Sequence, residues 1–184
     1  MVQPKHRIKF TAKDYMSMLG DKQYQLLDGE MILAPSPSDR HQFISLNLVM
    51  ILQTFVRSSS LGRIRFAPLD VVLSEYDVAQ PDILFVSNSR SDIITEANIQ
   101  GAPDLVVEIL SPGTAAHDRG YKQALYGRHR VREYWIVDPE AETIDVLGES
   151  SDGLTLLGTY RSGQTMTSPL LEGLTIVLQE IFHE

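Results

Sequence analysis

The sequence has no cysteine among its 184 residues. Disulfide bonds and thiolate metal sites are therefore excluded. Any bound metal must be held by carboxylates, histidines, carbonyl groups or water, and this ligand set favours hard cations such as Mg²⁺ or Mn²⁺.

Long apolar runs are also missing, because no stretch approaches the roughly 18 residues that a membrane-spanning helix needs. The first ten residues, MVQPKHRIKF, are charged and contain no apolar core of the signal-peptide kind. We therefore expect an intracellular, cytoplasmic protein without a membrane partner.

Basic residues are in deficit, with 16 Lys and Arg against 24 Asp and Glu, a formal net charge of −8 and a pI near 5.1. This balance argues against a protein that coats nucleic acid without specificity, since such proteins are normally basic. It leaves room for a nuclease, because metal-binding carboxylates add negative charge and a local basic patch can still hold phosphate.

The length fits a single domain over residues 1–184. Apolar residues make up 43% and charged residues 22%, which is an ordinary globular balance. A chain of this length can bury a sizeable core without covalent cross-links.

The N-terminal third has clear helix and turn signals. Thr11 and Asp14 form a capping box for a helix over Thr11–Leu19. Asp28-Gly29 lies between two short strand patterns, Tyr24–Leu27 and Glu30–Ala34, and predicts a hairpin. Ser38 is a candidate N-cap for a longer helix that ends near residues 58–62.

The rest of the chain alternates strand and helix patterns and predicts an α/β (α+β) fold, with a mixed sheet flanked by helices. LVVEIL, at Leu105–Leu110, is nearly all apolar, which is typical of a strand buried on both faces. A second main helix is expected over Asp118–His129. The further expected strands are Asp70–Glu75, Pro81–Val86, Arg132–Val137 and three antiparallel C-terminal strands at Thr143–Leu147, Leu154–Tyr160 and Leu174–Leu178.

Two strand carboxylates are candidates for chemistry. Asp82 follows Pro81 at a strand start, and strand alternation puts Glu108 on the same face as Val106 and Leu110. A carboxylate inside an apolar strand is costly unless it is paired, hydrogen-bonded or bound to a cation. Two such carboxylates at neighbouring strand ends, with waters and a phosphate oxygen, make a typical Mg²⁺ site.

Lys122, on the following helix, is placed to reach the same point and stabilise charge on an attacked phosphate. Asp118 lies four residues earlier on the same helix face and could orient Lys122. Three structural readings stay open at this point. Asp82 could be an ordinary strand-start residue beside a proline. Glu108 and Lys122 could form a buried ion pair that only fixes packing, and Asp118 and Lys122 could be a solvated helix pair.

Four ordered motifs carry a family resemblance: PDILFV, APDLVVEILSPGT, DRGYKQALY and VREYWIVDP. Together they resemble the Uma-type family of restriction-endonuclease-like proteins, which belongs to the PD-(D/E)XK nuclease superfamily. The resemblance covers roughly Tyr24 to Leu178, including the Asp28-Gly29 hairpin and the start of the helix near His41.

The resemblance implies a restriction-endonuclease-like core that hydrolyses phosphodiester bonds with a divalent metal. Asp82 matches the Asp of the superfamily's PD motif, and Glu108 matches the acidic residue of its second motif. The usual pattern places a Lys two residues after that acidic residue, where this chain has Leu110. Lys122 would take its place from the helix, as the family pattern implies.

Two more residues match positions of the family. Glu30 would supply an additional carboxylate to the metal, or would simply flank the hairpin. His41 would contact metal, water or phosphate, or would only hydrogen-bond to the backbone in the first turn of its helix.

These residues predict a Mg²⁺- or Mn²⁺-dependent endonuclease with nucleic acid, expected to be DNA, as its substrate. A catalytically inactive member of the same fold that binds nucleic acid or a protein partner is the alternative, favoured by Leu110 and the net charge of −8. A hydrolase of another phosphoester is a third possibility. The C-terminal strands offer edges for pairing, and the resemblance agrees with a homodimer.

Overall fold

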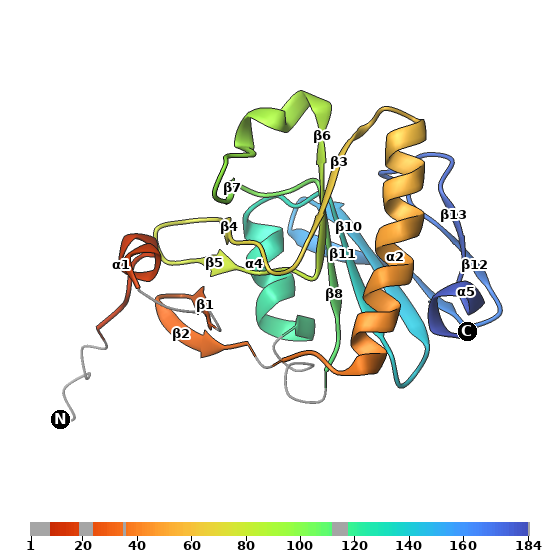
Figure 1. Ribbon diagram of the computed structural model, residues 1–184, viewed down its shortest axis with the longest axis horizontal. Helices are drawn as coiled ribbons and strands as arrows, with labels where there is room; N and C mark the ends of the chain where they lie inside the picture. Colours follow the sequence, from red (N-terminus) through yellow and green to blue (C-terminus); the bar gives the residue numbers. More distant parts are fainter. Residues whose placement is uncertain (1–7, 19–23, 35, 112–117, 184) are drawn as a thin grey trace.

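The main sheet of the protein has six strands in the order β11-β10-β9-β8-β6-β3 (Figure 1). The computed structural model describes residues 8–18, 24–34, 36–111 and 118–183. β8 runs parallel to β9, and every other neighbouring pair is antiparallel. The strands are β3 (Gly62–Phe66), β6 (Ile83–Ser87), β8 (Leu105–Ile109), β9 (Glu133–Asp138), β10 (Thr143–Ser150) and β11 (Gly153–Arg161).

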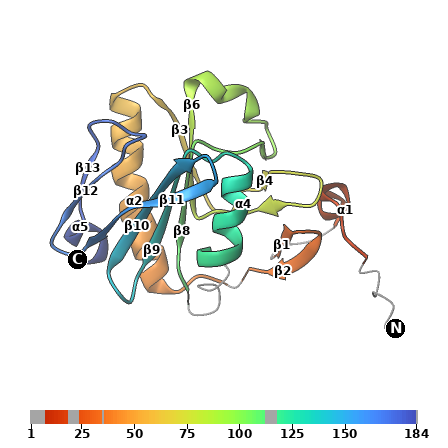
Figure 2. The ribbon, with the colours of Figure 1, turned by 180° about the vertical axis from the view of Figure 1, so that it is seen from behind.

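Two smaller sheets complete the strands. A five-stranded sheet in the order β2-β1-β5-β4-β7 lies on the side of α4 in both views (Figures 1 and 2). Its strands are β1 (Tyr24–Leu27), β2 (Glu30–Leu33), β4 (Val71–Val72), β5 (Val78–Ala79) and β7 (Ile99–Gln100). The third sheet pairs β12 (Thr165–Thr167) with β13 (Thr175–Val177). The mixed, helix-flanked sheet that the sequence predicts is confirmed.

The two main helices lie on opposite sides of β8 (Figures 1 and 2). The α-helices are α1 (Ala12–Ser17), α2 (Asp39–Ser58), α4 (Gln123–Arg128) and α5 (Gln179–Phe182), with a 3₁₀ helix η1 (Asn88–Ile93) and a π-helical turn η2 (Asp118–Lys122). Among the described residues, no helix is both long and apolar enough to span a membrane.

Helix α2 forms where the sequence predicts it. Ser38 is its N-cap, and the hydroxyl accepts a hydrogen bond from the His41 N–H at 3.2 Å. Ile44, Leu48, Leu52 and Val56 recur at helical spacing and are buried against the main sheet. This packing fixes the first turn of α2, and with it His41, close to one end of the sheet.

Strand β8 has apolar contacts on both faces, as its sequence predicts. Leu105, Val107 and Ile109 join the core under α2, whereas Val106 packs with α4 and the second core. Glu108 therefore lies on the face of the sheet that α4 covers, and it is only 3% exposed.

Several elements differ from the expected ones. Strand β3 has no counterpart among the sequence predictions, and of Asp70–Glu75 only β4 is a strand. The strand expected at Leu174–Leu178 is β13, which pairs with β12 and does not extend the main sheet. The helix expected over Asp118–His129 begins as the π-helical turn η2 and then continues as α4.

Candidate active site

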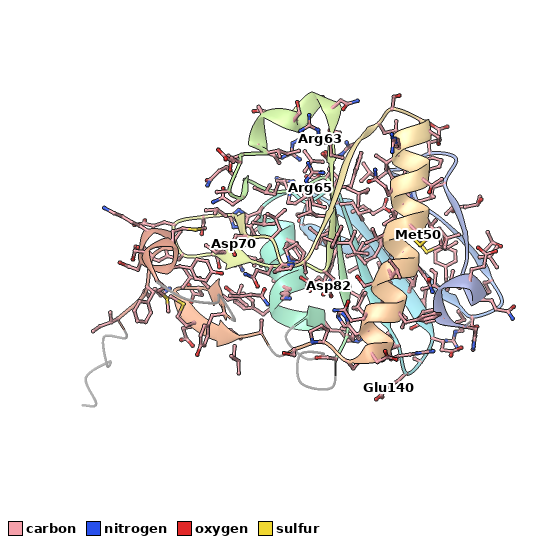
Figure 3. All side chains as sticks on the ribbon, in the orientation of Figure 1. Met50, Arg63, Arg65, Asp70, Asp82 and Glu140 are labelled. Carbon is pink, nitrogen blue, oxygen red and sulfur yellow. The ribbon has the colours of Figure 1, made fainter. Side chains whose placement is uncertain are left out.

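Asp82 and Glu108 meet at one end of the main sheet. Asp82 lies directly before β6, and the antiparallel register of β6 and β8, in which Ile83 faces Val107, brings Asp82 opposite Glu108. The Asp82 Oδ2 atom accepts a hydrogen bond of 2.7 Å from the Ile109 N–H. The two predicted carboxylates are therefore neighbours, tied together through the backbone of β8 (Figure 3 labels Asp82).

Lys122 reaches the Glu108 carboxylate, as the sequence predicts. The Lys122 Nζ atom lies 2.8 Å from Glu108 Oε2, and the two side chains are 6% and 4% exposed. Attraction between opposite charges is strong in such a site because little water is present to screen it. An ammonium group carries three N–H donors, of which one is directed at Glu108.

Tyr126 is the site residue that sequence reasoning missed. Its hydroxyl donates to Glu108 Oε1 at 2.6 Å, so one carboxylate receives a donor on each oxygen. Tyr126 is fully buried on α4, four residues after Lys122, and residues at that spacing share one helix face. The spacing from Lys122 was the available signal for Tyr126. The sequence YKQALY alone, however, does not distinguish a tyrosine that hydrogen-bonds to Glu108 from one that only packs in the core.

His41 joins the site from the first turn of α2. Its Nε2 atom is 3.3 Å from Asp82 Oδ1, and the two side chains are 13% and 17% exposed. Burial by itself lowers the pKa of His41, but the hydrogen bond to Asp82 and the negative charges of Asp82 and Glu108 outweigh it, so the pKa lies above 6.5. The Nδ1 atom is buried without a hydrogen-bond partner of normal geometry in the described part of the chain. The Ile109 backbone adds only the last and smallest contribution to the raised pKa.

The substitution His41→Gln is expected to cost more stability at about pH 5.5 than at about pH 8. Because the pKa of His41 is higher in the folded protein than in the unfolded chain, its contribution is complete below the unfolded pKa. It disappears as the pH rises through the folded pKa. Urea unfolding of the wild type and the variant at both pH values measures how the difference in their free energies of unfolding changes with pH. His129, whose pKa is lowered by burial, is present in both proteins and cancels. A wild-type advantage that grows with pH would contradict the assignment.

Glu30 and Asp118 are the two predicted residues that these contacts do not include. Glu30 is the half-buried first residue of β2 in the five-stranded sheet, whereas Asp82 and Glu108 belong to the six-stranded sheet. Asp118 is the first residue of η2, and its side chain lies outside the described part of the structure. The metal-binding role of Glu30 and the orienting role of Asp118 stay predictions.

The donor set fits a hard divalent cation as a partial site. Among the described residues, no group of three or more His, Asp or Glu side chains could hold a metal by itself. Mg²⁺, however, is usually bound through one or two carboxylates, with several waters and substrate phosphates completing its shell. Each oxygen of Asp82 and Glu108 has a neighbouring donor, and a carboxylate oxygen can accept from more than one partner. The two carboxylates can therefore contribute to such a site, but they do not complete it.

A mixed sheet with an Asp at one strand start, an inward Glu on the neighbouring strand and a Lys bonded to that Glu defines a restriction-endonuclease-like fold. Comparison with known proteins agrees with this class. The family model Uma2, described as "Putative restriction endonuclease", matches residues 12–179. The chain therefore belongs to the Uma2 family.

Two relatives extend the comparison. An uncharacterised protein from Synechocystis sp. is 25% identical over 166 residues, which cover 88% of this chain and 84% of that protein. A crystal structure from Anabaena variabilis, described as a "putative nuclease belonging to DUF820", has a TM-score of 0.78 at 19% identity. The match covers 94% of this chain and 97% of that one. At this identity the likeness shows the fold.

Proposed function

We propose that the protein is a Mg²⁺- or Mn²⁺-dependent endonuclease that hydrolyses phosphodiester bonds in DNA. The observation that carries this proposal is the buried Glu108 carboxylate, which is held between Lys122 and Tyr126 beside Asp82 at one sheet end. Such a group is costly to bury, so its retention in an apolar strand needs a reason. The family is described as "Putative restriction endonuclease", and a role for Glu108 in phosphodiester hydrolysis would be such a reason.

Each side chain has a role that follows from its contacts. Asp82 and Glu108 would hold the cation, which when bound would polarise the phosphodiester and lower the pKa of a bound water. Lys122 would orient the attacking water or stabilise charge on the attacked phosphate. Tyr126 fixes one oxygen of Glu108, and the Ile109 N–H fixes one oxygen of Asp82, so that the remaining lone pairs keep their direction.

His41 has a positioning role in this proposal. Its raised pKa favours a protonated imidazole beside Asp82 in the metal-free protein, which balances part of the negative charge there. Glu108 has Lys122 as its positive partner, and a protonated His41 would give Asp82 one as well.

The substitution Asp82→Asn tests the proposal because it removes charge and keeps shape. The Asn oxygen can still accept the Ile109 N–H, so the fold should persist. Cleavage of linear and supercoiled DNA in Mg²⁺ or Mn²⁺ is expected to fall roughly tenfold or more, since a neutral amide is a poorer ligand for a hard cation. Asp145→Asn is the matched control, because Asp145 is a strand aspartate of the same sheet that pairs with Arg119.

Wild-type cleavage that chelator abolishes, that Asp145→Asn retains and that Asp82→Asn loses would support the proposal. Equal cleavage by the two variants would refute the role of Asp82. The absence of cleavage by the wild type with either metal would favour the second candidate, a non-catalytic protein of this fold. The specific observation in its favour is that both oxygens of Glu108 already have hydrogen-bond partners within the protein.

A further inference from the structure

Strand β3, at the outer edge of the main sheet, carries two arginines on one face. Ile64 is buried in the core under α2, so strand alternation turns Arg63 and Arg65 to the opposite face. Glu108 is on that same face, because its neighbours in the sequence, Val107 and Ile109, belong to the core under α2. The two arginines and the candidate active site therefore share one side of the sheet.

The register places Arg65 next to the active-site row. Arg65 pairs with Leu84, which pairs with Val106. Two residues further toward the sheet end, the next row on the same face contains Asp82 and Glu108. With ordinary sheet spacings, the Cα atom of Arg65 lies about 8 Å from that of Asp82, and the Cα atom of Arg63 about 14 Å. Figure 3 shows Arg63, Arg65 and Asp82 in this order down the molecule.

Neither arginine has an acidic partner in the described part of the chain. Most other described arginines do, and the ion-paired ones are Arg40, Arg90, Arg119, Arg130 and Arg132. Arg63 is exposed. Arg65 is half-buried and donates from Nη1 to the Ile64 carbonyl at 2.8 Å. The Ile64 carbonyl points to the open edge of β3. The N–H of Ala67 and the carbonyl of Leu61 form hydrogen bonds on the β6 side of the strand. Backbone groups alternate in direction along an antiparallel strand, so the even-numbered residues between these two point away from β6.

Arg63 and Arg65 thus place two positive charges on one face of β3, without an ion pair among the described residues, in a protein with a net charge of −8. The carboxylates of the active site would repel a polyanion, so a substrate needs positive charge close to them. Arginine is suited to this task because its planar guanidinium can bind one phosphate through two N–H groups. The one hydrogen bond that the structure gives the Arg65 guanidinium uses Nη1, at the open edge of β3.

We propose that the β3 edge binds the phosphodiester backbone of a nucleic acid, with Arg65 and Arg63 contacting phosphates beside the bond held at Asp82 and Glu108. This inference rests on the proposed function and adds the path of the substrate to it. The backbone would run along β3 and enter the site past the start of β6. Contacts of this kind position a nucleic acid without reading its sequence, so any sequence preference must come from other residues.

The test is the affinity for a fluorescently labelled DNA duplex, measured by anisotropy in chelator so that cleavage does not intervene. The double variant Arg63→Gln/Arg65→Gln is expected to bind more weakly than the wild type. Its plot of log affinity against log salt concentration should also be less steep than that of the wild type. The slope should be smaller in magnitude by about 1.8, which is about 0.9 for each lost phosphate contact. Equivalently, the loss of affinity between about 50 and 200 mM salt should shrink by about tenfold.

Arg161→Gln is the matched control. Arg161 is an exposed arginine at the end of β11, on the opposite edge of the same sheet, and the structure pairs it with no carboxylate in the described residues. It should leave both the affinity and the salt slope unchanged. Urea unfolding of all three proteins checks that the substitutions leave stability nearly unchanged, as surface changes usually do.

An unchanged salt slope in the double variant would overturn the inference, and so would a wild-type protein that does not bind the duplex at low salt. The outcome is independent of the cleavage test. Cleavage with normal binding by the double variant would refute the β3 path alone. Binding that depends on Arg63 and Arg65, in a protein that never cleaves, would refute the nuclease proposal and keep the β3 path.

Discussion

Lys122→Met is expected to lower the free energy of unfolding by about 3 to 5 kcal/mol, because it leaves the buried Glu108 carboxylate without the Lys122 ammonium. Methionine has nearly the length of the lysine stem, so packing is kept while the charge is lost. The Tyr126 hydroxyl would still donate to Glu108, but it is neutral and does not replace the lost positive charge. Cleavage should fall by on the order of 10² to 10³, the usual effect of losing one electrostatic donor at the reacting group. Urea unfolding and a metal-dependent cleavage assay measure the two effects.

The double variant Glu108→Gln/Lys122→Met separates the structural from the catalytic effect. Replacing both members of a buried ion pair is often close to neutral for stability, and the Gln oxygen can still accept from Tyr126. Stability should therefore return in the double variant, whereas cleavage should stay absent. A Lys122→Met protein that is unstable at equilibrium but cleaves at the wild-type rate would show that Lys122 serves only packing.

The parts of the fold that the sequence predicts are those fixed by local interactions. The Thr11–Asp14 capping box is formed as expected, and Thr11 and Asp14 bond to each other's backbone N–H groups. Asp28 and Gly29 both have positive φ angles, 50° and 76°, which is why this residue pair marks a two-residue hairpin turn. The apolar run of β8 predicts a strand that is buried on both faces, and the structure confirms this burial.

Contacts between distant segments could not be derived in the same way. Strand β3, with the sequence GRIRF, alternates polar and apolar residues over too short a stretch to stand out beside the end of α2. Its strand conformation depends on pairing with β6, about twenty residues further along the chain. The hydrogen bond from Tyr126 to Glu108 and the approach of His41 to Asp82 likewise depend on how helices pack on the sheet.

The same limit explains the uneven outcome at the site. Asp82, Glu108 and Lys122 come together because two neighbouring strands and the helix covering them carry them, an arrangement that the order of elements already suggests. Glu30 belongs to a second sheet, whose position relative to the first is set by long-range packing. Its part in metal binding therefore cannot be inferred from the strand order.

A second buried glutamate, Glu133 on β9, gives a control for metal binding at Glu108. Glu133 is 1% exposed and accepts hydrogen bonds from Trp135 Nε1 at 2.6 Å, the Ser168 hydroxyl at 2.6 Å and the Leu170 N–H at 2.9 Å. All three donors are neutral, and the two from Ser168 and Leu170 tie β9 to the segment that follows β12. Glu133 therefore has a structural role, in contrast to Glu108, which contacts a lysine at the end of the sheet.

Calorimetric titration with millimolar Mn²⁺ is expected to show binding to the wild type and to Glu133→Gln, but not to Glu108→Gln. The amide at position 133 would point N–H groups at other donors, so this variant should lose stability. The Asp82–Glu108 pair should stay intact, because it lies on the opposite face of the sheet. The amide at position 108 removes one of two charged ligands for the cation. Equal binding by all three proteins would show that Glu108 does not hold the metal. Loss in both variants would trace the effect to weakened folding, because only a ligand role predicts loss at Glu108 alone.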